Sequence, residues 1–306
     1  MTNLYFLFAC LLLGFLLQKA KVLPDNAAAT MNSLIVNVFL PALTLRYAVG
    51  LQWNSNTMLP ILSTWIVFAA SYCFFTFLKR YYDWDKSTVG ALIVVAGISS
   101  ISFVGYPIFE LLYGIEGLQI GIAMSQSGTF LVCSTVGIAT VSMFATGENQ
   151  QVDWRQIFKD IFTFLPFVAF CIALIINFLQ IKYNPIFEEI LGKIGAPFSC
   201  IALISIGFQM NFRIEKNNVS PLMFGLLFKL ILAPLLIFFL YFVCFKQNNL
   251  GAKISVFGSM LGSMNTIGII AIRKGLNEKL ILQLLAMSIP LSLVLLGMVQ
   301  LLLDKI

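Results

Sequence analysis

The stretch Ser100-Ile-Ser-Phe-Val-Gly-Tyr-Pro-Ile-Phe-Glu-Leu-Leu-Tyr-Gly114 interrupts a long apolar run that is otherwise typical of a helix. A proline in a helix interior removes a backbone donor and costs about 3 kcal/mol. In hydrocarbon, each backbone group left without a partner costs several kcal/mol more. We therefore expect Gly105, Tyr106 and Pro107 to mark a purposeful helix break, whose freed backbone groups are satisfied by other parts of the chain.

The composition is that of a membrane protein. Of the 306 residues, 59% are hydrophobic and 10% are charged, whereas soluble proteins carry about 25% charged residues. The net charge of +6 comes from basic residues scattered among short loops, which form no stripe for a nucleic acid. The sequence thus predicts a multi-pass protein of the lipid bilayer, located in the cell membrane, with no nucleic-acid partner.

The sequence lacks the clustered ligands of a metal site and the paired nucleophile and base of an intramembrane enzyme. The chain has no histidine, and its six cysteines fall within apolar runs without CxxC spacing. Zinc sites need clustered Cys or His ligands, and covalent catalysis needs a nucleophile paired with a base. We expect no metal, no cofactor and no catalytic residue. A coupling ion, Na+ or H+, is left open, although a carboxylate proton relay would have only Glu110 within a span to use.

Polar punctuation divides the chain into ten apolar runs, each near the ~20 residues that a membrane-crossing helix needs. The longest polar interval lies between the fifth and sixth runs. The sequence therefore predicts an all-α membrane protein of ten transmembrane helices, with a first five-helix repeat at residues 1–146, a cytoplasmic linker at 147–156 and a second repeat at 157–306. The runs are approximately 3–18, 28–49, 58–78, 87–112, 118–144, 157–180, 185–210, 220–245, 252–273 and 279–303.

The two halves resemble each other in the order and spacing of their motifs. Phe39-Leu-Pro-Ala-Leu43 in run two has a counterpart in Gly195-Ala-Pro-Phe-Ser199 in run seven. The break at 105–107 in run four has one in Gly262-Ser-Met-Asn-Thr266 in run nine. Because five is an odd number, the second copy must enter the membrane inverted. Inverted repeats with a broken helix in each half, here helices 4 and 9, indicate the binding site of a secondary transporter.

Loop charges indicate the orientation in the membrane. Loops after the odd-numbered runs hold about twice as many Lys and Arg residues as loops after the even-numbered runs. By the positive-inside tendency, the more basic loops are cytoplasmic. Both termini are then predicted to be extracytoplasmic.

The chain resembles the auxin efflux carrier family, which includes plant auxin exporters and bacterial permeases for malate, malonate and similar acids. The resemblance covers essentially the whole chain. It implies ten spans, termini outside, an inverted five-helix repeat with a fold similar to bile acid–sodium symporters, and two helices that cross at breaks in spans four and nine. Family members typically have a proline in the second break, where this chain has Met264-Asn265. The motifs are Phe39-Leu-Pro-Ala-Leu43, Ser102-Phe-Val-Gly-Tyr-Pro107, Ala202-Leu-Ile-Ser-Ile-Gly-Phe-Gln209 and the segment from Gly262 to Gly268.

Polar side chains near the two breaks are the candidate binding groups. Hydroxyls and amides can bond a carboxylate or a cation, although serines also bond back to carbonyls of their own helix. Asn265 is favoured as functional because an amide at membrane depth is costly without a designated partner. The predicted substrate-binding residues are Ser100, Ser102, Tyr106, Asn265, Thr266, Asn37, Gln209 and Lys229; the predicted helix-break residues are Gly105, Pro107, Ser263 and Met264.

Lys229 stands nine residues into run eight, roughly 13 Å along a helix at 1.5 Å per residue. An intramembrane cation at this depth is a functional hypothesis and would favour an organic anion. The alternative is that its long side chain snorkels towards the cytoplasmic interface. The sequence alone leaves both open.

Together these features predict a secondary transporter that moves a small organic anion, a mono- or dicarboxylate, by alternating access. Its site would lie at the crossover of helices 4 and 9. The alternative from another class is a transporter-derived membrane sensor that binds a ligand without carrying flux. Such sensors usually append a soluble domain, which the short linker and tails disfavour. The sequence leaves open the anion, the direction of transport and the oligomeric state, a homodimer included.

Overall fold

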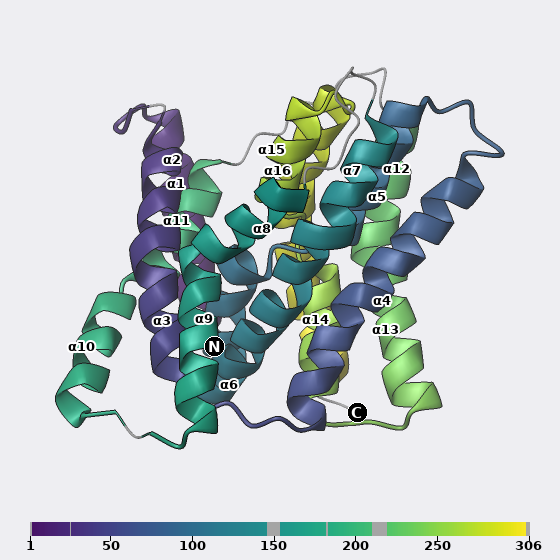
Figure 1. Ribbon diagram of the computed structural model, residues 1–306. Coiled ribbons are helices and arrows are strands. Elements are labelled where there is room, and N and C mark those ends of the chain that lie inside the picture. The colour runs from purple at the N-terminus through teal and green to yellow at the C-terminus, as the bar shows by residue number, and fades with distance from the viewer. Residues whose placement is uncertain (1, 25, 146–153, 182, 210–218, 304–306) are drawn as a thin grey trace. The chain divides into compact units, whose positions relative to one another are not determined.

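The computed structural model describes residues 2–24, 26–145, 154–181, 183–209 and 219–303, and this part of the chain consists of helices, their connections and one isolated β-bridge (Figure 1). The protein is therefore an all-α membrane protein, while the count of ten spans stays a prediction. Among the described residues, six helical runs are long and apolar enough to cross a membrane: Ala27–Ala48, Ser55–Leu78, Ile101–Phe144, Pro185–Phe208, Val219–Cys244 and Glu278–Gly297. Three further apolar helices are shorter: Tyr5–Lys19, Lys86–Gly97 and Leu165–Phe178.

The run Ile101–Phe144 is too long for one crossing. Its 44 residues would extend about 66 Å as a straight helix, roughly twice the hydrocarbon thickness of a bilayer. The chain changes direction within α6 (Tyr106–Ala123) at Gly114, whose φ of 64° lies in the left-handed region. Glycine adopts this conformation without a steric penalty from Cβ. The run is thus two helices joined at Gly114.

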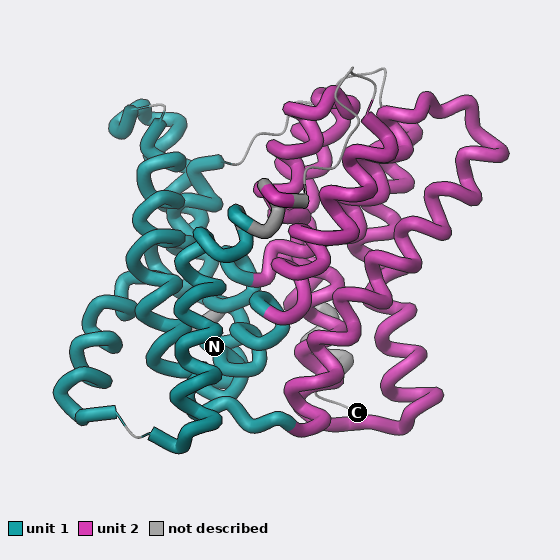
Figure 2. The backbone as a smooth tube through the Cα atoms, in the orientation of Figure 1, with its two compact units in different colours: residues 1–53, 102–126, 158–210 teal, residues 54–101, 127–157, 211–306 magenta. Residues whose placement is uncertain are grey.

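The chain divides into two compact units (Figure 2). Unit 1 comprises residues 1–53, 102–126 and 158–210, and unit 2 comprises residues 54–101, 127–157 and 211–306. Each unit draws on both halves of the chain, so this spatial division differs from the two predicted sequence repeats, which stay a prediction. Part of the predicted linker, 147–153, lies outside the described residues, as does Met210 at the end of run seven.

Unit 1 is built around two helices that approach closely, α1 and α11. A Cβ placed on Gly14 would meet the carbonyl oxygen of Ile204, and one placed on Gly207 would meet that of Leu11. Small residues allow such close helix packing in membranes, where dispersion replaces the hydrophobic drive. The helices of this unit are α1 (Thr2–Lys19), α2 (Ala27–Leu34), η1 (Ile35–Phe39), α3 (Leu40–Ala48), α6, α9 (Leu165–Phe178), α10 (Pro185–Gly195) and α11 (Phe198–Phe208), and α8 (Trp154–Thr163) crosses the unit boundary.

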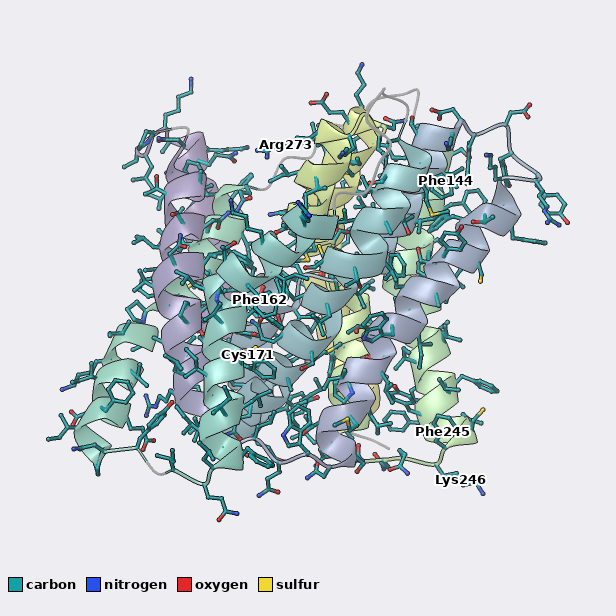
Figure 3. All side chains as sticks on the ribbon, in the orientation of Figure 1. Phe144, Phe162, Cys171, Phe245, Lys246 and Arg273 are labelled. Atoms are coloured by element: carbon teal, nitrogen blue, oxygen red, sulfur yellow. The ribbon has the colours of Figure 1, made fainter. Side chains whose placement is uncertain are left out.

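Unit 2 is built around its helix α5 (Lys86–Gly97), which is buried from Ser87 to its end. The Ser71 hydroxyl of α4 donates to the Ile93 carbonyl of α5 at 2.9 Å. Within this unit, Phe144 and Arg273 lie at one end, and Phe245 and Lys246 lie at the other (Figure 3). The remaining helices are α4 (Ser55–Leu78), η4 (Cys133–Gly137), α7 (Ile138–Phe144), α12 (Val219–Leu227), η6 (Phe228–Leu232), α13 (Ala233–Phe238), η7 (Phe239–Cys244), α14 (Leu250–Met260), α15 (Asn265–Arg273) and α16 (Glu278–Leu303).

Three prolines are accommodated by π-helical turns rather than by helix breaks. Pro41 follows η1, Pro107 follows η2 (Ile101–Gly105) and Pro234 follows η6, each by two residues. A π-helical turn widens the backbone spiral, which relieves the clash of the proline ring with the preceding turn. A further π-helical segment, η3 (Met124–Phe130), follows α6. The prolines therefore bend or widen their helices without ending them.

Candidate functional site

The first helix break lies upstream of the predicted one. Helix α5 ends at Gly97, Ile98 is extended with φ −117° and ψ 122°, and the helical path resumes at Ile101. Gly105, by contrast, has helical dihedrals of −71° and −45°. The prediction that Gly105 and Pro107 form the break is therefore wrong in position, because the π-helical turn of η2 absorbs the proline. The break comprises Ile98, Ser99 and Ser100.

The second break occupies the corresponding place in the other half of the chain. Helix α14 ends at Met260, and α15 begins at Asn265. Leu261 and Met264, at the two ends of the link, have ψ angles of 148° and 122°, so the chain is extended there. The predicted break residues Ser263 and Met264 fall in this link.

The two extended links pair with each other inside unit 2. Ser99 and Ser263 form an isolated antiparallel bridge. The Ser100 amide donates to the Gly262 carbonyl at 2.8 Å, and the Met264 amide donates to the Ile98 carbonyl at 3.1 Å. These bonds flank the Ser99–Ser263 pair, which makes it a non-hydrogen-bonded pair with its two side chains on the same face. The pairing supplies partners for backbone groups that the breaks would otherwise leave open.

Serines of α16 hold the second link in place. The Ser263 amide donates to the Ser288 hydroxyl at 3.0 Å, and the Gly262 amide donates to the Ser292 hydroxyl at 3.2 Å. Gly262 lies so close to α16 that a Cβ would stand 2.6 Å from the Cα of Ile289. The second link thus requires glycine at this position for steric reasons.

A buried lysine stands beside the paired links. Lys229, on η6, is 0% exposed, and its Nζ donates to the Ser99 hydroxyl at 2.7 Å. In the described part of the chain no carboxylate lies within ion-pair distance of Lys229. Ser263 is 1% exposed, and its Oγ has no hydrogen-bond partner among the described residues. Unit 2 therefore places a buried lysine amine, and a buried hydroxyl without a hydrogen-bond partner among the described residues, at the two links.

Comparison with known proteins identifies the family. A family model described as "Membrane transport protein" matches residues 1–299. The chain belongs to this family. The match agrees with the auxin efflux carrier-like motifs of the sequence, so this resemblance is confirmed.

Two archaeal relatives carry only general names. One, from Methanothermobacter thermautotrophicus and named "Uncharacterized transporter", is 28% identical over 288 residues, covering 92% of this chain and 91% of the relative. The other, "Uncharacterized transporter MJ1031" from Methanocaldococcus jannaschii, is 22% identical over 231 residues, covering 73% of each. This protein is thus a membrane transporter by family, and its substrate is a separate question.

The remaining predicted site residues of this membrane transport protein are distributed over both units. Ser100 is buried in the first link, and Asn265 and Thr266 are the first two residues of α15, where Thr266 is exposed. Four predicted residues belong to unit 1: Asn37 on η1, Ser102 on η2, Tyr106 on α6 and Gln209 directly after α11.

Two of the unit 1 residues make local hydrogen bonds. The Asn37 amide donates to the carbonyl and the hydroxyl of Ser33, one turn earlier. The Gln209 amide donates to the carbonyl and the hydroxyl of Ser205 at 3.0 and 3.2 Å. These bonds satisfy amide groups within a single helical turn.

Tyr106 is fully buried in unit 1, and its hydroxyl accepts from the Gln126 amide at 3.4 Å. The ring packs against Phe198, with centroids 5.9 Å apart. The oxygen of the same amide, Gln126 Oε1, is buried without a hydrogen-bond partner among the described residues. Glu110, also on α6, accepts from the Ser199 hydroxyl of α11 at 2.6 Å.

Two residues of the site were missed by the sequence reasoning. Ser288 and Ser292 hold the second link, yet neither stands near a break in the sequence. Their spacing of four residues, which places both hydroxyls on one face of an apolar helix, is the signal that could have indicated them. Their role depends on the position of Gly262 and Ser263, which the sequence does not give.

Proposed function

We propose that this membrane transport protein is a secondary transporter that moves a small organic anion, a mono- or dicarboxylate, by alternating access. The observation that carries the proposal is the pair of helix breaks in unit 2 with Lys229 beside them, which is buried and has no acidic partner among the described residues. Broken helices whose ends meet at membrane depth are the usual framework of a transporter binding site.

The charges at the breaks favour an anion. Helix α15 begins at the second link, and the side chain of its N-cap residue, Met264, makes no capping hydrogen bond. The N-terminus of a helix carries roughly half a positive charge, which suits a carboxylate. In its protonated form Lys229 adds a full positive charge nearby, and no carboxylate among the described residues neutralises it. A negatively charged solute would complete the charge balance of the site.

We assign the contacts to the residues around the links. Asn265 and Thr266 would bind the carboxylate at the start of α15, with Ser100, Ser263 and Met264 lining the link region. Ser102, Tyr106, Asn37 and Gln209 in unit 1 are candidate contacts in other states of the transport cycle. Alternating access would then change the position of one unit against the other.

The ten-span inverted repeat and the orientation belong to the same proposal. In support, α5 and α14 have similar lengths, 12 and 11 residues, and each begins at a side-chain cap, Asp85 and Asn249 respectively. Each is followed by an extended link and a second helix. This common order is what two copies of one five-helix pattern would produce. We propose a cell-membrane location with both termini extracytoplasmic.

Flux measurements test the proposal. The purified protein is reconstituted into sealed vesicles, and uptake of labelled mono- and dicarboxylates is measured. We expect at least one carboxylate to be transported and Asn265→Ala to abolish its flux. The matched control is Asn248→Ala, an exposed amide in the loop before α14, which should keep normal flux. No flux of any carboxylate through well-folded protein, or normal flux in Asn265→Ala, would contradict the function or the site respectively.

A further inference from the structure

The first broken helix directs its negative end at the paired links. Helix α5 runs from Lys86 to Gly97, so its C-terminal carbonyl groups face the first link. The C-terminus of a helix carries roughly half a negative charge, and cations are stabilised there. In transporters with broken helices, coupling cations bind at such helix ends together with unwound backbone.

Lys229 occupies this place with its own side chain. Its Nζ bonds to Ser99, which lies two residues beyond the last residue of α5. The side chain is fully buried, so the snorkelling alternative does not describe it. The Lys229 amine also has no acid partner in the described residues. Its favourable interactions here are therefore the Ser99 hydroxyl and the negative end of α5.

The face of the links that carries Ser99 also carries a second hydroxyl. Ser99 and Ser263 are directly opposite in a non-hydrogen-bonded pair, so their side chains point to the same side. The Ser263 Oγ is buried and has no hydrogen-bond partner among the described residues. Two hydroxyl oxygens beside a helix C-terminus are oxygen ligands of the kind that hard cations bind.

From this arrangement we propose that Lys229 is a built-in cation that fills the cation site of the crossover, in place of an exchangeable coupling cation. The inference deepens the proposed transport function by assigning the charge that compensates the anion. Because the cation is covalently part of unit 2, the site needs no sodium to be complete. Removal of the ammonium would leave Ser99, Ser263 and the end of α5 open to a free cation.

The first test needs no substrate. Thermal unfolding of the purified protein is compared in sodium chloride and in choline chloride at equal ionic strength. We expect equal unfolding temperatures for the wild type and a sodium-specific rise of about 2–4 °C for Lys229→Gln, whose amide oxygen can join the two hydroxyls as a ligand. Lys229→Arg, which keeps a cation, should not respond to sodium.

The matched control is Lys79→Gln, at an exposed lysine directly after α4 in the same unit, and it should not respond to sodium. A sodium-specific rise in the unfolding temperature of the wild type would overturn the proposal. This measurement on the wild type tests the proposal even if Lys229→Gln does not fold. A folded Lys229→Gln without a sodium response would also overturn it.

Flux measurements separate this inference from the function on which it rests. With a transported carboxylate, we expect full wild-type flux in choline medium and at least a tenfold loss in Lys229→Gln that sodium partly restores. Sodium-dependent wild-type flux would refute the built-in cation while leaving anion transport intact. The absence of any carboxylate flux, with sodium-insensitive unfolding of the wild type and sodium-stabilised Lys229→Gln, would refute the proposed carboxylate transport and retain the cation site.

Discussion

Replacing Gly262 with alanine tests the packing of the second link against α16. In the native chain, a Cβ at this position would stand 2.6 Å from the Cα and 2.8 Å from the amide nitrogen of Ile289. Both atoms are backbone, so neither can rotate away, and the link must move outward. The amides of Gly262 and Ser263 would then lose their bonds to Ser292 and Ser288.

The expected cost of Gly262→Ala follows from these contacts. Overpacking costs about 1–3 kcal/mol, and each lost hydrogen bond contributes about 1 kcal/mol. The lower end of this range gives roughly 3 kcal/mol, which lowers the unfolding temperature by about 6–12 °C. Because the φ of Gly262 is not positive, the loss is steric and owes nothing to backbone conformation.

The assay is thermal unfolding in detergent, with Gly297→Ala as the matched control. Gly297 lies on α16, and a Cβ there would have no atom within 4 Å, so its unfolding temperature should not fall. Carboxylate flux should be lost in Gly262→Ala even below its unfolding temperature. A Gly262→Ala protein as stable as the control would refute the placement of the second link against α16.

Three further outcomes follow from the structure. Gly207→Val should separate α1 from α11 and lower the unfolding temperature by several degrees; unchanged stability would contradict the close approach to Leu11. In a cysteine-free background, Arg273→Cys should react with an impermeant maleimide from the cytoplasmic side and Lys246→Cys from outside; labelling of both from one side would contradict the proposed orientation. Burial raises the pKa of the Asp85 carboxyl, but hydrogen bonds from Ser87 and Thr88 outweigh it and hold the pKa below its ordinary value. The stabilisation is therefore present above an ordinary carboxyl pKa, near 3.9, and is lost as the pH falls below it. Asp85→Asn should accordingly lower stability at neutral pH and lose this difference in strong acid; a pH-independent difference would refute the assignment.

The fold class was predictable because it depends on composition and on the length of apolar runs. With 10% charged residues, the chain cannot cover itself with charge, whatever its tertiary contacts. This inference rests on local chemistry, which a single sequence records directly. The break in run four was predicted from the cost of Pro107, but the structure keeps that proline within a helical path and interrupts the run at 98–100 instead.

The position of that break was not predictable, because two longer-range effects decide it. The π-helical turn of η2 accommodates Pro107, so the residue with the strongest local signal does not end the helix. Ile98, Ser99 and Ser100 carry weaker local signals but pair with the link at 262–264. That pairing joins segments about 160 residues apart in the sequence, and no local sequence pattern predicts it.

The environment of the candidate site residues was equally outside the reach of local patterns. The depth of Lys229 along its helix was readable from the sequence, but not whether its side chain snorkels or turns inward to Ser99. Asn37 and Gln209 looked available for a ligand, yet their amides bond within one helical turn. Side-chain partners depend on which faces meet, and hydrophobic periodicity alone does not fix them.

The central claim is that two interrupted spans are joined through Ser99 and Ser263. Non-hydrogen-bonded antiparallel pairs bring Cα atoms to about 4.5 Å, which is within the range that a disulfide bridges. In a cysteine-free chain, the double variant Ser99→Cys/Ser263→Cys should form an intramolecular disulfide under mild oxidation, detected by mass spectrometry of linked peptides. Ser99→Cys/Ser255→Cys, with the second position two turns earlier on α14, should not. The absence of a disulfide in the first pair, or equal yields in both, would contradict the claim.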